Sequence, residues 1–95
     1  MKILLLEDTL SLNKAITQIL DINGHEVLSF TDGQEAMNNI TSHIDLYLLD
    51  ITVPNINGLE LLTMIKNYNQ YSKVIIMSAD TSINTLSLAY KNGCI

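Results

Sequence analysis

The feature of this sequence that most constrains its fold is an alternation of short apolar runs with amphipathic segments. The apolar runs cover residues 2–6, 26–30, 46–49 and 73–77. Amphipathic segments follow at residues 10–23, after Asp32, at residues 59–67 and at residues 82–92. Because such strands are too apolar to face water, four strand–helix units predict a doubly wound α/β fold with a parallel sheet covered by helices on both sides.

Local signals define the ends of several expected helices. Gly24 and Gly93 stand just past the first and last helices, where glycine readily adopts the left-handed conformation. Asp32, with Glu35 three residues later, resembles a capping box that opens a short second helix. The first helix carries one apolar stripe, the pattern by which a helix covers a core, formed by Leu12, Ile16, Ile19 and Leu20.

Composition and charge exclude several classes of function. The 95 residues, 47% hydrophobic and 16% charged, predict one globular domain over residues 1–95. A net charge of −5, with no arginine, offers no basic surface, so we expect no nucleic-acid binding by this segment. The longest apolar run is far shorter than the roughly 18 residues of a membrane span, and no signal peptide is evident, so we expect a cytoplasmic protein without membrane contact. The single cysteine, Cys94, excludes an intrachain disulfide.

Three acidic residues stand at the ends of two expected strands. Glu7 and Asp8 follow the first strand, and Asp50 ends the third. Ligand sites in such sheets form beyond the carboxyl ends of the strands, so the three carboxylates converge if these strands are neighbours. Hard oxygen ligands of this kind suit Mg²⁺. Capping of a helix by Asp8 or of a loop by Asp50 explains either residue alone, but it does not explain the set.

Four short motifs fall at the ends of the expected strands and carry a resemblance. They are Glu7-Asp8, Leu48-Leu49-Asp50, the following Pro54 and Gly58, and Ile76-Met77-Ser78-Ala79. In this order and spacing they resemble the receiver domains of bacterial two-component response regulators over the whole chain. The resemblance implies a flavodoxin-like receiver fold with strand order 2-1-3-4-5.

The resemblance also implies a role for each site residue. Asp50 would be the phosphoacceptor, taking a phosphoryl group from a sensor histidine kinase or a phosphotransfer protein. Mg²⁺ would be held by Asp8, Asp50 and the backbone carbonyl of Thr52, with Glu7 acting through a water molecule. Ser78 would hydrogen-bond the phosphoryl group and act as a switch. A receiver of this kind accepts phosphoryl groups and is not expected to be an enzyme; any contact with DNA would need a separate output domain.

Complete receivers have two further elements that would lie beyond Ile95. These are a fifth strand, which carries a lysine that contacts the phosphoryl group and an aromatic switch residue, and a fifth helix. Without the fifth strand, residues 74–77 would form an apolar sheet edge, and such edges recruit other chains. We therefore expect either self-association that covers the fourth strand or partial unfolding.

Three alternative functions differ in how well they fit. A haloacid-dehalogenase-type phosphatase also forms an aspartyl phosphate, but its pattern has a second aspartate where this chain has Thr52. A dinucleotide-binding module is disfavoured because Glu7-Asp8-Thr9 replaces the Gly-rich phosphate turn. A receiver-like interaction module without phosphotransfer stays open, because the expected lysine would lie beyond Ile95.

Overall fold

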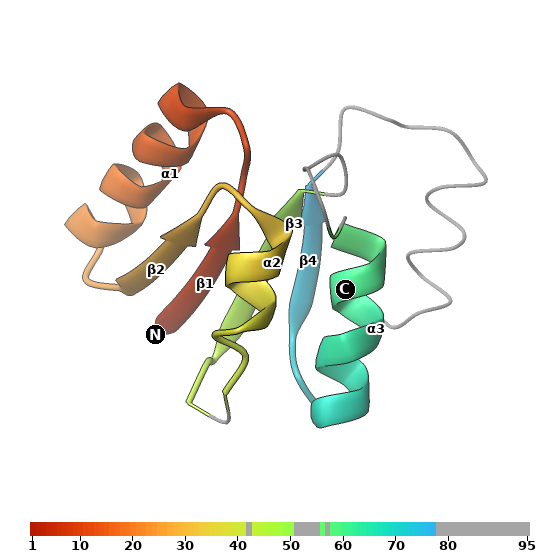
Figure 1. Ribbon diagram of the computed structural model, residues 1–95. Helices are drawn as coiled ribbons and strands as arrows, with labels where there is room; N and C mark the ends of the chain where they lie inside the picture. Colours follow the sequence, from red (N-terminus) through yellow and green to blue (C-terminus); the bar gives the residue numbers. More distant parts are fainter. Residues whose placement is uncertain (42, 51–55, 57, 78–95) are drawn as a thin grey trace.

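The computed structural model describes residues 1–41, 43–50, 56 and 58–77. Its elements alternate as the sequence predicts (Figure 1), in the order β1 (Lys2–Leu6), α1 (Leu10–Ile22), β2 (Glu26–Phe30), α2 (Gly33–Met37), β3 (Leu46–Asp50), α3 (Gly58–Tyr68) and β4 (Val74–Met77). The helix expected over residues 82–92 lies outside the described residues. Among the described residues, no helix is long and apolar enough to cross a membrane.

The four strands form one parallel sheet with the order β2-β1-β3-β4, which confirms the predicted fold class. Leu4 on β1 pairs with Leu28 on β2 and with Tyr47 on β3. The chain moves from β1 outward to β2, then back past β1 to β3 and on to β4, so the sheet order reverses beside β1. Ligands bind at such a reversal in doubly wound sheets, which places the expected site at the carboxyl ends of β1 and β3.

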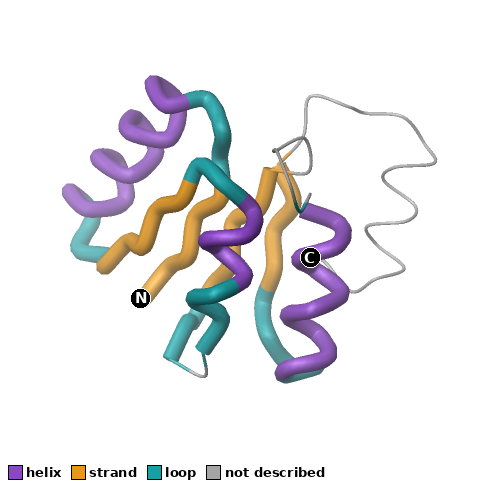
Figure 2. Tube along the Cα trace, viewed as in Figure 1, coloured by secondary structure: helices purple, strands orange, loops and turns teal. Residues whose placement is uncertain are grey.

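The main core lies between the sheet and the helices α2 and α3, which lie next to each other (Figure 2). Its fully buried members are Leu4, Leu6, Ala36, Tyr47, Leu49, Leu61, Leu62, Ile65 and Val74. Side chains alternate between faces along a strand, so the equally buried Ile3 and Leu5 belong to the opposite face of β1. Both faces of β1 are therefore buried, which explains why its sequence is almost purely apolar.

Helix α1 ends as the sequence predicts. Gly24, just past the helix, has φ +87°, and its N–H donates to the carbonyl of Asp21 at 3.0 Å. The N–H of His25 donates to the carbonyl of Leu20 at 3.1 Å. These bonds satisfy carbonyls that the end of a helix otherwise leaves without partners.

The expectation that the apolar stripe of α1 is buried is wrong in part. Leu12 is 48% exposed and Ile19 is 60% exposed, while Ile16 and Leu20 are half-buried. Helix α1 packs against β1 and β2 at one side of the sheet, so no described element covers part of its apolar stripe. The one buried residue of the helix is polar, Asn13.

Helix α2 begins at a close backbone contact. Asp32 is its N-cap, and the Asp32 carboxylate accepts a hydrogen bond from the N–H of Gln34 at 2.7 Å, which confirms the predicted start. A Cβ atom at Gly33 would lie 1.8 Å from the carbonyl oxygen of Ile56. Only glycine fits here, because the start of α2 lies directly against the backbone of Ile56.

β4 is the last strand in the described order, beside β3. Ile75 at its middle is 38% exposed. Residues 78–95 are not described, so self-association through this strand stays a prediction.

Candidate metal centre

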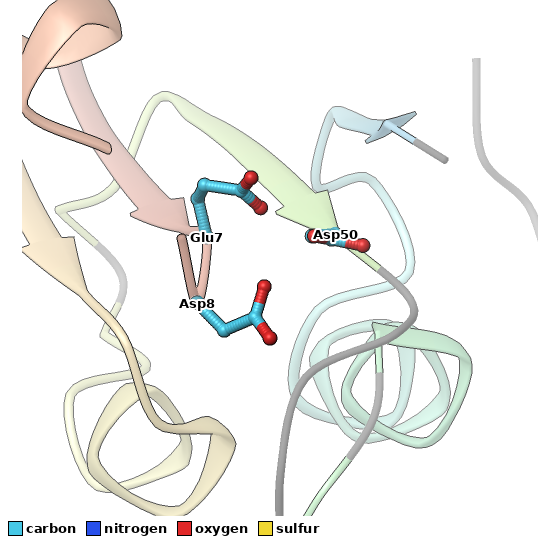
Figure 3. A group of neighbouring side chains, drawn as sticks. All are labelled: Glu7, Asp8 and Asp50. Atoms are coloured by element: carbon cyan, nitrogen blue, oxygen red, sulfur yellow. The ribbon is translucent and has the colours of Figure 1, made fainter. Parts of the chain in front are cut away.

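The three acidic residues lie together at the carboxyl ends of β1 and β3 (Figure 3). Leu6 pairs with Leu49 across these neighbouring strands, so Glu7, just past the end of β1, and Asp50, the last residue of β3, follow directly from a paired position. Asp8 follows Glu7 as the chain leaves the sheet towards α1. The convergence predicted from strand ends is therefore what the structure shows.

The cluster is compact and mostly shielded from water. One carboxylate oxygen from each of Glu7, Asp8 and Asp50 lies within 4.8 Å of the others. Glu7 is 4% exposed and Asp50 is 9% exposed, whereas Asp8 is exposed. Two buried carboxylates and one at the surface form a site that an ion can reach from one side.

Burial and the neighbouring acids raise the free energy of ionising Glu7. Burial raises the pKa of the Glu7 carboxyl from its usual 4.5 to about 7, and a hydrogen bond with Asp50 and the charges of Asp50 and Asp8 act in the same direction. The backbone N–H of Asp8 has a smaller, opposite effect. Near pH 7 Glu7 therefore carries a proton in about half of the molecules, and a bound cation would offset the same unfavourable charge.

The donor set fits a small, hard divalent cation. Mg²⁺ takes oxygen ligands at about 2.1 Å in an octahedron, in which neighbouring ligands are about 3 Å apart and opposite ligands about 4.2 Å apart. The three carboxylate oxygens lie within 4.8 Å of one another, so small side-chain rotations would bring them to the spacing of Mg²⁺ ligands. Three carboxylates leave several positions for water and for an oxygen ligand from outside.

Only some of the site residues predicted from the sequence lie within the described part of the chain. The structure brings together Glu7, Asp8 and Asp50, whereas Thr52 and Ser78 lie outside the described residues. Met77 pairs with Asp50 across β3 and β4, so the described chain leads directly up to Ser78. The sequence reasoning missed Asn13, which is buried next to the site; its one signal was a polar residue within the apolar pattern of the first helix.

The family model of the response regulator receiver domain matches residues 3–95, so the chain belongs to this family. One curated relative is the CAI-1 autoinducer sensor kinase/phosphatase CqsS of Vibrio cholerae serotype O1, which is 34% identical over 97% of this chain and 14% of that protein. The transcriptional regulatory protein CpxR of Escherichia coli K12 is 33% identical over 82% of this chain and 33% of that protein. The chain thus spans about a third of CpxR and about a seventh of CqsS.

Solved structures agree with the family and the fold. A CheY-like response regulator receiver domain protein from Methanospirillum hungatei superposes with a TM-score of 0.92 at 26% identity, over 98% of this chain and 75% of that chain. The CheX–CheY–BeF₃–Mg²⁺ complex from Borrelia burgdorferi gives a TM-score of 0.89 at 28% identity, over 98% of this chain and 72% of that chain. The chain therefore has the receiver fold.

Proposed function

We propose that this chain accepts a phosphoryl group on Asp50, with Mg²⁺ at Glu7, Asp8 and Asp50, and thereby switches an output domain or a partner protein. The observation that carries the proposal is the cluster of three carboxylates, two of them buried, at the reversal point of a receiver sheet. A buried cluster of like charges is costly to fold unless a cation or a proton neutralises it. A metal site is the function that accounts for this cost.

Asp50 is the residue best placed to act as the nucleophile. It ends β3, between the acidic pair that follows β1 and the end of β4, and its carboxylate faces the other two acids (Figure 3). A carboxylate oxygen of Asp50 attacks the phosphorus of a phosphohistidine. A P–O bond forms, the P–N bond breaks, and the electron pair of that bond stays on the imidazole nitrogen, which then takes up a proton.

All three acids would take part in holding the cation. Asp8 and Asp50 would hold it directly, and Glu7 would release its proton and act through a water molecule. When bound, Mg²⁺ supplies positive charge that lets an anionic phosphoryl group approach an anionic carboxylate. Under this proposal the backbone carbonyl of Thr52 is a further ligand, and Ser78 donates a hydrogen bond to a phosphoryl oxygen.

The proposed phosphoryl donor is a sensor histidine kinase or a phosphotransfer protein. Support comes from the relatives: one matched protein is named as a sensor kinase/phosphatase, and another similar protein is a CheY whose structure contains BeF₃, Mg²⁺ and the protein CheX. The net charge of −5 gives this segment no basic surface for DNA, so an effect on transcription would require another domain.

Phosphorylation by acetyl phosphate tests the proposal without a kinase. We expect Mg²⁺-dependent addition of one phosphoryl group, located on Asp50 by peptide mass spectrometry after borohydride reduction. Asp50→Asn should abolish the modification, and Asp45→Asn, an exposed acid at the other end of β3, should leave it unchanged. A phosphoryl group on another residue would contradict the assignment of Asp50 as the phosphoacceptor. No phosphoryl group in a folded chain that binds Mg²⁺ would instead favour an interaction module without phosphotransfer.

A further inference from the structure

Asn13 is an unusual choice for the one buried position of α1. It is 4% exposed, whereas apolar residues of the same helix remain in contact with water. Burying an amide costs free energy unless its polar atoms form hydrogen bonds. Packing alone would favour leucine here, so the amide itself needs an explanation.

The Asn13 side chain joins the ends of two strands. Its Nδ2 donates one hydrogen bond to the carbonyl of Glu7 and one to the carbonyl of Phe30, both at 3.1 Å. The Phe30 carbonyl also accepts a bond from the N–H of Glu7 at 3.0 Å. The hydroxyl of Thr17 donates to Asn13 Oδ1 at 3.4 Å, which orients the amide with its nitrogen towards the two carbonyls.

Both backbone polar groups of Glu7 are hydrogen-bonded in this arrangement. Its N–H is bound to Phe30, the last residue of β2, and its carbonyl is bound to Asn13. The Glu7 carbonyl and the Asp8 N–H belong to one planar peptide unit, so fixing the carbonyl fixes the plane that joins the two acids. Strand β1 ends at Leu6, so this peptide lies past the strand and gains its position from Asn13.

We propose that Asn13 is a positioning residue of the metal site: by fixing the Glu7–Asp8 peptide, it aims both carboxylates at Asp50. The inference rests on the proposed function, because it concerns the Mg²⁺ site named there. Residues that orient metal ligands typically change metal affinity by about 10–100-fold when they are mutated. A residue that only packed α1 against the sheet would change the free energy of unfolding and leave the Mg²⁺ affinity of the folded chain unchanged.

The test compares Asn13→Leu, which keeps the volume but loses both donors, with Asn23→Ala. Asn23 lies at the other end of the same helix, and its Nδ2 donates to the carbonyl of Ile19 at 2.7 Å, so the control also loses an amide–carbonyl bond. Mg²⁺ affinity is measured by calorimetry, and folding is checked by circular dichroism. Sucrose, which favours the folded state, is added to all samples, and Asn13→Ser serves as a second, smaller variant.

We expect Asn13→Leu and Asn13→Ser to weaken Mg²⁺ binding about 10-fold or more, and Asn23→Ala to leave it within about twofold of the wild type. In urea with excess Mg²⁺, the Asn13 variants should also gain less stability from the ion than the control does. A folded Asn13 variant with wild-type affinity would overturn this inference and leave the proposed function standing. A wild-type chain that does not bind Mg²⁺ would overturn both.

Discussion

Replacing Glu7 by glutamine should stabilise the metal-free chain at alkaline pH, although it removes a residue of the metal site. The amide has nearly the shape of the protonated carboxyl and can still donate a hydrogen bond to Asp50. Raising the pKa of Glu7 from 4.5 to about 7 makes its ionisation in the folded chain cost about 3 kcal/mol, since one pKa unit corresponds to about 1.4 kcal/mol. Glutamine avoids this cost because it does not ionise.

The sign of the effect depends on pH. Well below pH 4.5, Glu7 is protonated in both the folded and the unfolded chain, so Glu7→Gln should change stability little. Between about pH 4.5 and 7 the unfolded wild type loses the proton while the folded chain keeps it, so the free energy of unfolding falls relative to the variant; the difference is complete once pH has risen through about 7. At pH 8 the variant should be more stable by up to about 3 kcal/mol.

Urea unfolding at pH 5 and pH 8, with EDTA and then with excess Mg²⁺, measures this difference. Glu35→Gln, an exposed acid on α2, is the control and should change stability by less than about 1 kcal/mol at either pH. Mg²⁺ at about 1,000 times its Kd should reverse the order at pH 8, because at that excess the ion adds about 4.1 kcal/mol to the chain that binds it better. A difference between wild type and Glu7→Gln that does not change with pH would refute the electrostatic reasoning.

Three further substitutions test how the fold supports the site. Gly33→Ala should destabilise the chain by more than about 1 kcal/mol in urea unfolding, despite the higher helix propensity of alanine, because the new methyl group meets the carbonyl of Ile56. Unchanged stability would mean that the backbone of Ile56 moves aside at little cost. Asp32→Ala should cost about 1 kcal/mol through loss of the cap on Gln34, and no change would show that the cap is replaced by water. Leu62→Ala should cost about 2–5 kcal/mol, since this side chain is fully buried, and a smaller cost would indicate that the core collapses around the gap.

Much of the fold could be predicted from the sequence because the strands are buried on both faces. Residues such as Leu4 and Leu5 lie on opposite faces of β1 and are both inaccessible, so the run has to be apolar throughout. Gly24 and Asp32 marked helix ends because their local conformations carry their own sequence preferences. Strand order followed from the resemblance rather than from these local signals.

Contacts between elements were harder to predict. The exposure of Leu12 and Ile19 depends on where α1 lies across the sheet, which its apolar period does not specify. Asp32 predicted the start of α2, but nothing in the sequence predicted that another backbone approaches the next residue, Gly33. The three acids were predictable because parallel strands bring their carboxyl ends to one edge, whereas the buried bonds of Asn13 join residues of three different elements.

An NMR titration with Mg²⁺ shows whether Glu7, Asp8 and Asp50 form one metal site. We expect the signals of all three residues to shift together along a single binding curve. Asp8→Asn and Asp50→Asn should each weaken Mg²⁺ binding by about 10-fold or more, whereas Asp45→Asn should leave it unchanged. If binding survives both Asp8→Asn and Asp50→Asn at wild-type affinity, these three acids do not form the Mg²⁺ site.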